Sequence, residues 1–263
     1  THLVMPISFR HTIPKFILMM KIKRITLVVV FLFLKGNAQI VDTISTTQNQ
    51  NKIALKQLLI PVTLITSGAL LVNTKENQQI QSSVRNTFGN DFHTPVDDYI
   101  QLVPVAQIYA GKYLGFKSKN DFVHQTINIA LANAIMCGVV IGLKNTFKEE
   151  RPDGSNNLSY PSGHTATAFT NASLLFYEYK DANFWYASSG FLFATATGLL
   201  RIANNKHYAS DVLTGAGIGT AVGLLVSYWH PFQSFNLGKS KKTTALVYPQ
   251  IGSQVGVGLV VRM

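Results

Sequence analysis

Six apolar segments joined by short polar connectors constrain the fold of this chain more than any other feature of its sequence. These segments are rich in leucine, alanine, isoleucine and glycine, and with the short connectors this favours helices over strands. The number of residues fits one domain of this kind. The sequence therefore predicts an all-α bundle of six helices, which cover residues 53–73, 98–114, 122–143, 164–178, 184–200 and 211–229.

Two of these segments are long enough to cross a lipid bilayer. Residues 183–200 and 212–229 each offer 18 positions without a charged side chain, close to the roughly 20 needed for a span. Aromatic residues stand at segment ends, as at membrane interfaces, and glycines allow close helix packing. Segment 98–114 contains Pro104 and Lys112 and argues for a buried soluble bundle instead. We predict a membrane-embedded bundle and keep the soluble one as the alternative.

The first 38 residues have the composition of a targeting segment. A basic stretch at residues 21–24 precedes the apolar run 25–34, and the small residues Gly36 and Ala38 stand at positions −3 and −1 of the cleavage site. This order predicts a secretory signal peptide that is cleaved after Ala38. A membrane anchor is the alternative, although the run is short for a span. Residues 1–19 precede Met20 and are interpreted as an upstream extension.

These features divide the chain into four parts. The tail contains two β-rich runs on either side of Gly252 and Ser253, which predict a short hairpin without chemistry of its own. The parts are an upstream extension and signal peptide at 1–38, a polar lead-in at 39–52, a helical domain at 53–232 and the tail at 233–263.

Charge and cysteine content exclude two further features. The formal net charge is +11, but six cations and no acid fall in residues 1–38, which leaves +5 for the rest. No basic stripe with interleaved aromatic residues remains, so the sequence argues against nucleic-acid binding. The single cysteine, Cys137, excludes an intrachain disulfide and is interpreted as a small core residue.

Three polar clusters interrupt the apolar segments and supply cations, histidines and a carboxylate. Each has a structural explanation when taken singly, such as a lysine that reaches the membrane interface, a serine that caps a helix, or a histidine–aspartate contact. The combination is better explained by phosphate chemistry. The clusters are Lys144 with Arg151, then Ser162-Gly163-His164, then Arg201 with His207 and Asp211.

The first two clusters suit the binding of a phosphate group. Arginine presents a planar fork of donors to two phosphate oxygens, and lysine adds a point charge. Ser162 can cap the segment that follows, and the free N–H groups of a helix start bind anions. Gly163 allows the backbone to approach the phosphate closely. His164 is then placed to protonate a leaving alkoxide.

The third cluster suits a nucleophilic histidine. His207 and Asp211 are four positions apart, so on a helical turn they share one face. A carboxylate bound to one ring nitrogen fixes the tautomer of the imidazole and leaves the other nitrogen free to attack. No carboxylate cluster suited to Mg²⁺ accompanies these residues, so the sequence predicts no metal and no cofactor.

The spacing of the clusters resembles that of the type 2 phosphatidic acid phosphatase superfamily, which includes class A acid phosphatases and vanadium haloperoxidases. The chain reads K-x6-RP, PSGH and R-x5-H-x3-D over residues 144–211, within a resemblance that covers about 98–230. Leu200 stands where the family has a serine that is not the nucleophile.

The resemblance implies a role for each residue of the three clusters. His207 would attack phosphorus and form a phosphohistidine, Asp211 would hold its ring, and His164 would protonate the leaving group. The phosphate oxygens would be bound by Lys144, Arg151, Arg201 and the amides of Ser162 and Gly163.

The function predicted from this resemblance is a metal-independent phosphatase that acts on lipid phosphate monoesters or pyrophosphates. Its substrates would be phosphatidic acid, phosphatidylglycerol phosphate, undecaprenyl pyrophosphate or the lipid A phosphates. The alternatives are a soluble periplasmic acid phosphatase, a vanadate-dependent haloperoxidase and an inactive membrane bundle. The sequence makes no prediction of the oligomeric state.

The predicted location is the inner membrane of a bacterial cell envelope, with the active site facing the periplasm. Lysines such as Lys117 and Lys180 lie in the connectors opposite the clusters, and the positive-inside rule puts those connectors in the cytoplasm. A cleaved signal peptide followed by three full spans before Lys144 would instead put the site in the cytoplasm.

Overall fold

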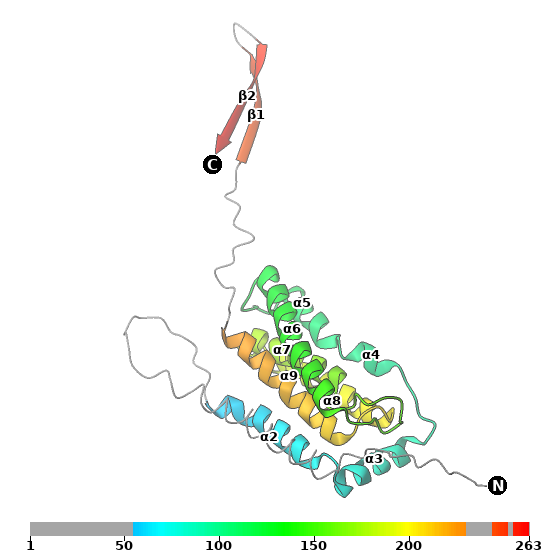
Figure 1. Cartoon of the computed structure of the whole chain (residues 1–263). Helices are drawn as coiled ribbons and strands as arrows, with labels where there is room; N and C mark the ends of the chain where they lie inside the picture. Colours follow the sequence, from blue (N-terminus) through cyan, green and yellow to red (C-terminus); the bar gives the residue numbers. More distant parts are fainter. Residues whose placement is uncertain (1–54, 230–243, 252–254, 263) are drawn as a thin grey trace, which may run out of the picture.

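The computed structural model describes residues 55–229, 244–251 and 255–262 (Figure 1). The predicted signal peptide and polar lead-in lie outside the described residues. Within the described ranges the chain forms eight helices and a pair of strands. The helices are α2 (Leu55–Leu71), α3 (Lys75–Phe88), α4 (Val96–Ile100), α5 (Val103–Tyr113), α6 (Phe122–Phe147), α7 (Gly163–Tyr179), α8 (Phe184–Ala203) and α9 (Ala209–Trp229).

The eight helices of the described region differ from the six that the apolar segments predict. The polar helix α3 has no apolar run to reveal it; instead the Thr74 hydroxyl caps it by accepting from the Asn77 N–H at 3.1 Å. The predicted segment 98–114 is interrupted after Ile100, so it contributes to both α4 and α5. The axes of α2 and α3 differ by 97°, so α3 turns away from the direction of α2.

The strands of the tail are β1 (Thr244–Ile251) and β2 (Val255–Arg262). They pair antiparallel, with Thr244 opposite Arg262 and Ile251 opposite Val255.

Side-chain caps define where the long helices begin. Asp121 accepts from the N–H of His124 at 2.8 Å before α6, and Asn183 accepts from the N–H of Tyr186 at 3.0 Å before α8. Such caps satisfy donors that have no partner within a helix. At the other end of α6, Lys148 adopts a left-handed conformation with φ of 47° and stops the helix.

The long helices alternate in direction between two ends of the bundle. Near the start of α2, Gln57 donates to the hydroxyl of Tyr228 at the end of α9; toward the other end of α2, Gly68 lies against Ser210. We call the end with connectors 148–162 and 204–208 the loop end. The opposite end, which carries Lys112, Lys117, Lys119 and Lys180 in and next to its connectors, is the lysine end.

A seam of glycines brings α7 and α9 into close contact. Gly215, Gly219 and Gly223 are spaced by four residues and so lie on one face of α9. A Cβ atom at Gly219 would stand 2.4 Å from the carbonyl oxygen of Ala166, and one at Gly215 would stand 2.5 Å from that of Ser162. Only glycine permits backbones to approach this closely, so the seam sets the relative position of the two helices.

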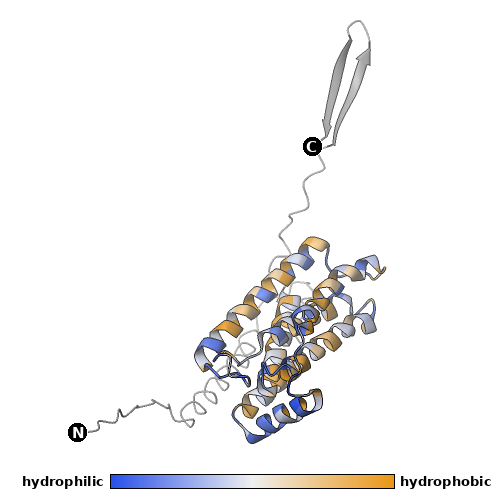
Figure 2. Cartoon of the chain, turned by 90° about the vertical axis from the view of Figure 1, so that its right-hand side faces the viewer, coloured by the Kyte–Doolittle hydropathy of each residue, from blue (hydrophilic) through white to orange (hydrophobic). Residues whose placement is uncertain are grey.

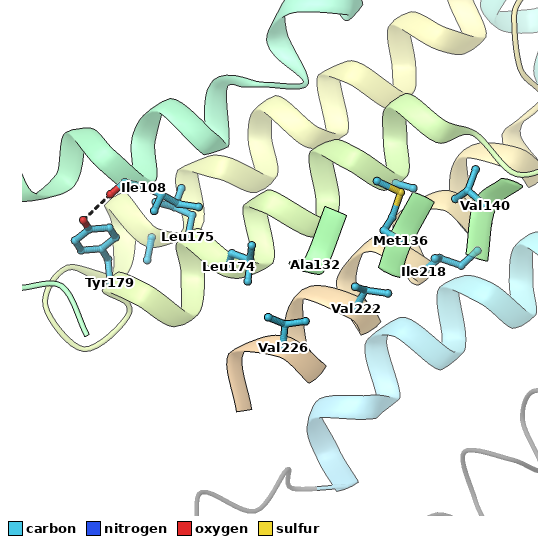
Figure 3. Close-up of a cluster of buried hydrophobic side chains, with 12 residues drawn as sticks. Ile108, Ala132, Met136, Val140, Leu174, Leu175, Tyr179, Ile218, Val222 and Val226 are labelled. Carbon is cyan, nitrogen blue, oxygen red and sulfur yellow. Dashed lines mark hydrogen bonds between the residues drawn. The ribbon is translucent and has the colours of Figure 1, made fainter. Parts of the chain in front are cut away.

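Apolar side chains fill the space between α5, α6, α7 and α9 (Figure 3). Leu174 and Leu175 of α7 and Val222 and Val226 of α9 belong to this core. The Tyr179 hydroxyl at the edge of the core donates to the carbonyl oxygen of Ile108 at 2.7 Å, so the one polar atom of this buried ring has a partner.

Two of the described helices, α6 and α9, are long and apolar enough to cross a membrane, and the bent pair α2 and α3 would make a third. The predicted span at 183–200 in α8 is not among them, since this helix includes the charged Arg201 in its last turn. Only 17% of the most apolar window of α6 is buried, against 78% for α9. The helices carry many apolar residues (Figure 2), and few of those in α6 are buried, as lipid contact requires; these features indicate a membrane protein.

The burial of α6 also corrects the interpretation of Cys137. Its side chain is exposed, so it is not a core residue. Ile135 and Val139 of the same helix are also 37% and 41% exposed. Some apolar residues of this run are thus exposed. An apolar run alone does not distinguish a buried core from a lipid-facing surface.

The glycine seam predicts a specific loss of stability. Gly219→Ala should lower the free energy of unfolding by about 1–3 kcal/mol, since the added methyl group has no space against the backbone of α7. Gly138→Ala is the matched control, because a Cβ at this exposed helical position would meet nothing within 4 Å and alanine favours the helix. Thermal unfolding in detergent measures both variants; an unchanged Tm for Gly219→Ala would contradict the close packing.

Candidate active site

The three polar clusters lie at the loop end of the bundle. Lys144 is in the last turn of α6, His164 in the first turn of α7, and Arg201 in the last turn of α8. His207 precedes α9, and Asp211 lies in its first turn. The alternating directions of the helices thus bring together residues that are far apart in the sequence.

His207 and Asp211 form a buried pair. Nδ1 of His207 lies 3.3 Å from Oδ2 of Asp211, and the two residues are 1% and 0% exposed. The helix begins at Ala209, so the pair meets across the start of α9 and does not share a helical face as the spacing predicts. A neutral His207 that donates from Nδ1 to this carboxylate presents an unprotonated Nε2.

The carboxylate of Asp211 is held by several other donors. Its Oδ2 accepts from the hydroxyl of Ser159 and, at 3.0 Å, from the N–H of Tyr208. Its Oδ1 accepts from the hydroxyl of Ser210 at 3.1 Å. Ser159 and Ser210 were missed by the sequence analysis, since neither belongs to a spaced motif. They fix the carboxylate that orients His207.

Burial keeps the imidazole of His207 neutral. Loss of solvent lowers its pKa to about 4 despite the opposing effect of Asp211, and the charges of Arg201 and Lys144 act in the same direction as burial. The unprotonated form needed for nucleophilic attack is therefore the main form near neutral pH.

The start of α7 is fixed to the start of α9 through Ser162. Its hydroxyl caps α7 by accepting from the Thr165 N–H, while its own N–H donates to the carbonyl oxygen of Asp211 at 3.0 Å. The Ser162 amide is thus engaged within the protein. The N–H groups of Gly163 and His164, in the first turn of α7, have no acceptor within the helix and suit an anion better.

Arg201 presents a donor with no partner. The residue is 7% exposed, and its Nη1 donates to Oδ2 of Asp97 at 2.7 Å. Its Nε is buried and makes no hydrogen bond to any described residue. Buried donors are nearly always satisfied, so this nitrogen is suited to an anion that enters the site.

Lys144 and Arg151 complete the cationic lining. Nζ of Lys144 donates to the carbonyl oxygens of Leu158 and Ser159, and Nε of Arg151 donates to Oδ1 of Asn156 at 3.0 Å. Burial and the charge of Arg201 lower the pKa of Arg151. Like charges held this close favour a bound anion.

His164 contacts a carboxylate that the sequence analysis did not single out. Its Nε2 lies 2.8 Å from Oδ1 of Asp98, at 31% exposure of the histidine side chain. Burial is the main cause that lowers the pKa of His164, and Arg201 adds to it, while Asp98 and Asp97 raise it. Within the described residues no group of three or more histidine, cysteine or acidic side chains could hold a metal ion.

Comparisons with known proteins agree with the motifs. A lipid A 1-phosphatase of Porphyromonas gingivalis is 40% identical over 167 residues, which are 63% of this chain and 37% of that protein. The chain thus spans little more than a third of this relative.

Two crystal structures are also similar. Aquifex aeolicus LpxE matches with 22% identity and a TM-score of 0.44 over 59% of this chain and 96% of that one. The first transmembrane PAP2-type phosphatidylglycerolphosphate phosphatase from Bacillus subtilis matches with 18% identity and a TM-score of 0.49 over 66% of this chain and 97% of that one.

The family model covers every residue of the three clusters and most of the apolar core. The model of the PAP2 superfamily matches residues 125–235. This match confirms the resemblance that the motifs indicate: residues 125–235 are similar to the PAP2 superfamily.

Proposed function

We propose that this chain is a phosphatase that hydrolyses lipid phosphate esters through a phosphohistidine on His207, without a metal ion. The buried His207–Asp211 pair carries the proposal, because it supplies a neutral and oriented nucleophile. Arg201, with its unpaired Nε, and the start of α7 supply the surrounding positive potential.

In the first step Nε2 of His207 attacks phosphorus and the bond from phosphorus to the ester oxygen breaks. His164 donates a proton to the departing oxygen, so that an alcohol leaves. Lys144, Arg151, Arg201 and the Gly163 amide stabilise the oxygens of the transferring phosphoryl group, where donors placed in advance contribute most.

In the second step water attacks the phosphohistidine and passes a proton to His164. The bond from phosphorus to Nε2 then breaks, inorganic phosphate leaves, and both histidines return to their starting states. The same imidazole thus acts first as acid and then as base.

The relative and the surface of the bundle support a lipid substrate. The Porphyromonas gingivalis protein is named a lipid A 1-phosphatase, so a lipid A 1-phosphate is the first substrate to test. Leu59 and Ile60 of α2 are 66% and 63% exposed, as expected for helices in contact with lipid. Phosphatidylglycerol phosphate, phosphatidic acid and undecaprenyl pyrophosphate are the further lipid substrates that we propose.

We also propose that the loop end faces the periplasm across the bacterial inner membrane. Four lysines, Lys112, Lys117, Lys119 and Lys180, mark the lysine end, and basic residues in short loops favour the cytoplasmic side. Trp185 and Trp229, which are 82% and 72% exposed, lie at the same end, as interfacial aromatic residues do.

The first prediction concerns the nucleophile. His207→Ala should lower phosphate release by roughly a thousandfold or more, because an essential nucleophile is lost. Release is measured with purified protein and a chelator, on a lipid A 1-phosphate, the other lipids and soluble esters. His124→Ala at the lysine end is the control and should retain full activity. Substantial turnover by His207→Ala would contradict the mechanism, and release from soluble esters alone would contradict a lipid substrate.

The second prediction concerns pH. Attack requires neutral His207, so kcat/KM should rise as the pH increases through about 4, the lowered pKa of this residue. Departure requires protonated His164, whose pKa lies below its usual 6.5, so kcat/KM should fall again as the pH passes that value. The optimum is expected on the acid side of neutrality. Activity that keeps rising into alkaline solution would exclude His164 as the acid.

The third prediction concerns orientation. In a Cys137→Ser background, Asn157→Cys at the loop end should react with a membrane-impermeant maleimide in spheroplasts. Lys117→Cys at the lysine end should react only after the membrane is permeabilised. The reverse pattern would place the site in the cytoplasm, as a cleaved signal peptide followed by an odd number of spans requires.

A further inference from the structure

Two consecutive carboxylates on the short helix α4 reach the site from outside the three clusters. Asp97 contacts Arg201, and Asp98 contacts His164. The stretch that contains α4 offers no spaced motif, which is why the sequence analysis passed over both residues. Each carboxylate binds a different functional group of the site.

Asp97 anchors α4 to the end of α8. It is 1% exposed, and its Oδ1 accepts from Nδ2 of Asn204 at 2.9 Å in addition to the bond from Arg201. Asn204 also donates to the carbonyl oxygen of Thr94 at 2.8 Å and accepts from the Thr94 N–H at 2.9 Å. The segment that leads into α4 therefore has a fixed position against the site.

This anchoring determines where Asp98 lies. With Asp97 held at the end of α8, the next side chain of α4 is directed to the first turn of α7, where its Oδ1 lies 2.8 Å from Nε2 of His164. The contact engages one nitrogen of the imidazole and leaves the other, Nδ1, for the substrate.

We propose that Asp98 is a positioning residue for the general acid: it holds Nε2–H of His164 and keeps Nδ1–H directed to the oxygen that leaves. This inference rests on the proposed phosphatase function. The site then contains two histidine–carboxylate pairs with complementary tasks, His207–Asp211 for attack and His164–Asp98 for departure.

The position of His164 explains why a carboxylate is needed there. The imidazole stands at the positive end of the α7 dipole and is acted on by the charge of Arg201 from α8, while Asp97 and Asp98 of α4 act in the opposite sense. Burial also disfavours the imidazolium. Asp98 offsets part of these effects and so favours the form of His164 that carries a proton on Nδ1 when the ester oxygen departs.

Each proton that His164 gives up in the first step is regained in the second. Protonated His164 gives the Nδ1 proton to the ester oxygen as the phosphorus–oxygen bond breaks, and it retains the Nε2 proton that Asp98 accepts. The neutral ring then takes a proton from the attacking water at Nδ1. Asp98 remains a carboxylate throughout, so its effect is on the orientation and charge of His164.

The test compares two leaving groups. Asp98→Asn should lower kcat/KM about tenfold or more for an alkyl phosphate, whose oxygen requires a proton to leave. The loss should be about threefold or less for p-nitrophenyl phosphate, whose leaving phenolate is stable without one. The alkaline limb of the pH profile should move to lower pH. Asp181→Asn, which removes an exposed carboxylate paired with Lys119 at the lysine end, is the matched control and should change none of these values.

A double-mutant cycle separates positioning from a general structural role. In the His164→Gln background, Asp98→Asn should cause no further loss on the alkyl phosphate, because the acid that it positions is absent. Equal losses on both substrates, or the same loss with and without His164, would overturn the inference while the wild type remains active. A wild type that releases no phosphate from any substrate would overturn the proposed function and this inference with it.

Discussion

The close contact between α7 and α9 is the constraint on which the rest of the site depends. Without side chains at Gly215 and Gly219, the backbone of α9 lies directly against Ser162 and Ala166. The Ser162 N–H then reaches the carbonyl oxygen of Asp211, which joins the start of α7 to the first turn of α9. In the proposed mechanism, a phosphate at the start of α7 and the His207 nucleophile held by Asp211 would come close together for this reason.

The site concentrates cations in a partly buried place, and nearby carboxylates and carbonyl groups compensate for them. Arg201 is paired with Asp97, and Lys206 donates to Asp153 at 2.6 Å. Burial raises the pKa of Asp153, but the bond from Lys206 and bonds from Ser155 outweigh it and lower the pKa to about 2. The cost of holding like charges together is thus reduced, while Nε of Arg201 would stay available to the phosphate of the proposed reaction.

The parts of the site that could be predicted from the sequence are those whose chemistry depends on fixed spacing. The eight residues of the three clusters are recognisable because phosphate binding and histidine attack require these residue types together. Asp97 and Asp98 could not be found in this way, since they act through the fold: contacts of Asp97 and Thr94 with the end of α8 hold α4 in place. Ser159 could not be predicted either, because its bond to Asp211 depends on the path of connector 148–162 and not on a fixed spacing in the sequence.

The helices, too, could be predicted from the sequence only in part. Apolar segments predict α2, α6, α7 and α9 well because burial or lipid contact requires long apolar runs in both cases. They do not separate the two environments, and the exposed Cys137 of α6 shows the consequence. The polar helix α3 is defined by its Thr74 cap and by the buried amides Asn77 and Gln81, which bond to Ser210 and to the carbonyl oxygen of Ile202. Such long-range polar contacts have no periodic signature in a sequence.

Apolar side chains next to the site bear on the kind of phosphate ester that it could accept. Exposed apolar side chains stand at the loop end beside the charged groups: Val96, Tyr99 and Leu102 in or next to α4 are 47%, 72% and 53% exposed. A phosphate ester with acyl chains would place its charged group among Lys144, Arg151 and Arg201 and its apolar part against such residues. Because α4 also carries Asp97 and Asp98, the same short helix would contact the apolar part of the substrate and hold two groups that act on its phosphate. A small soluble ester would contact only the groups that act on its phosphate and not the apolar side chains of α4. This difference would be a physical reason for a preference for lipid phosphates.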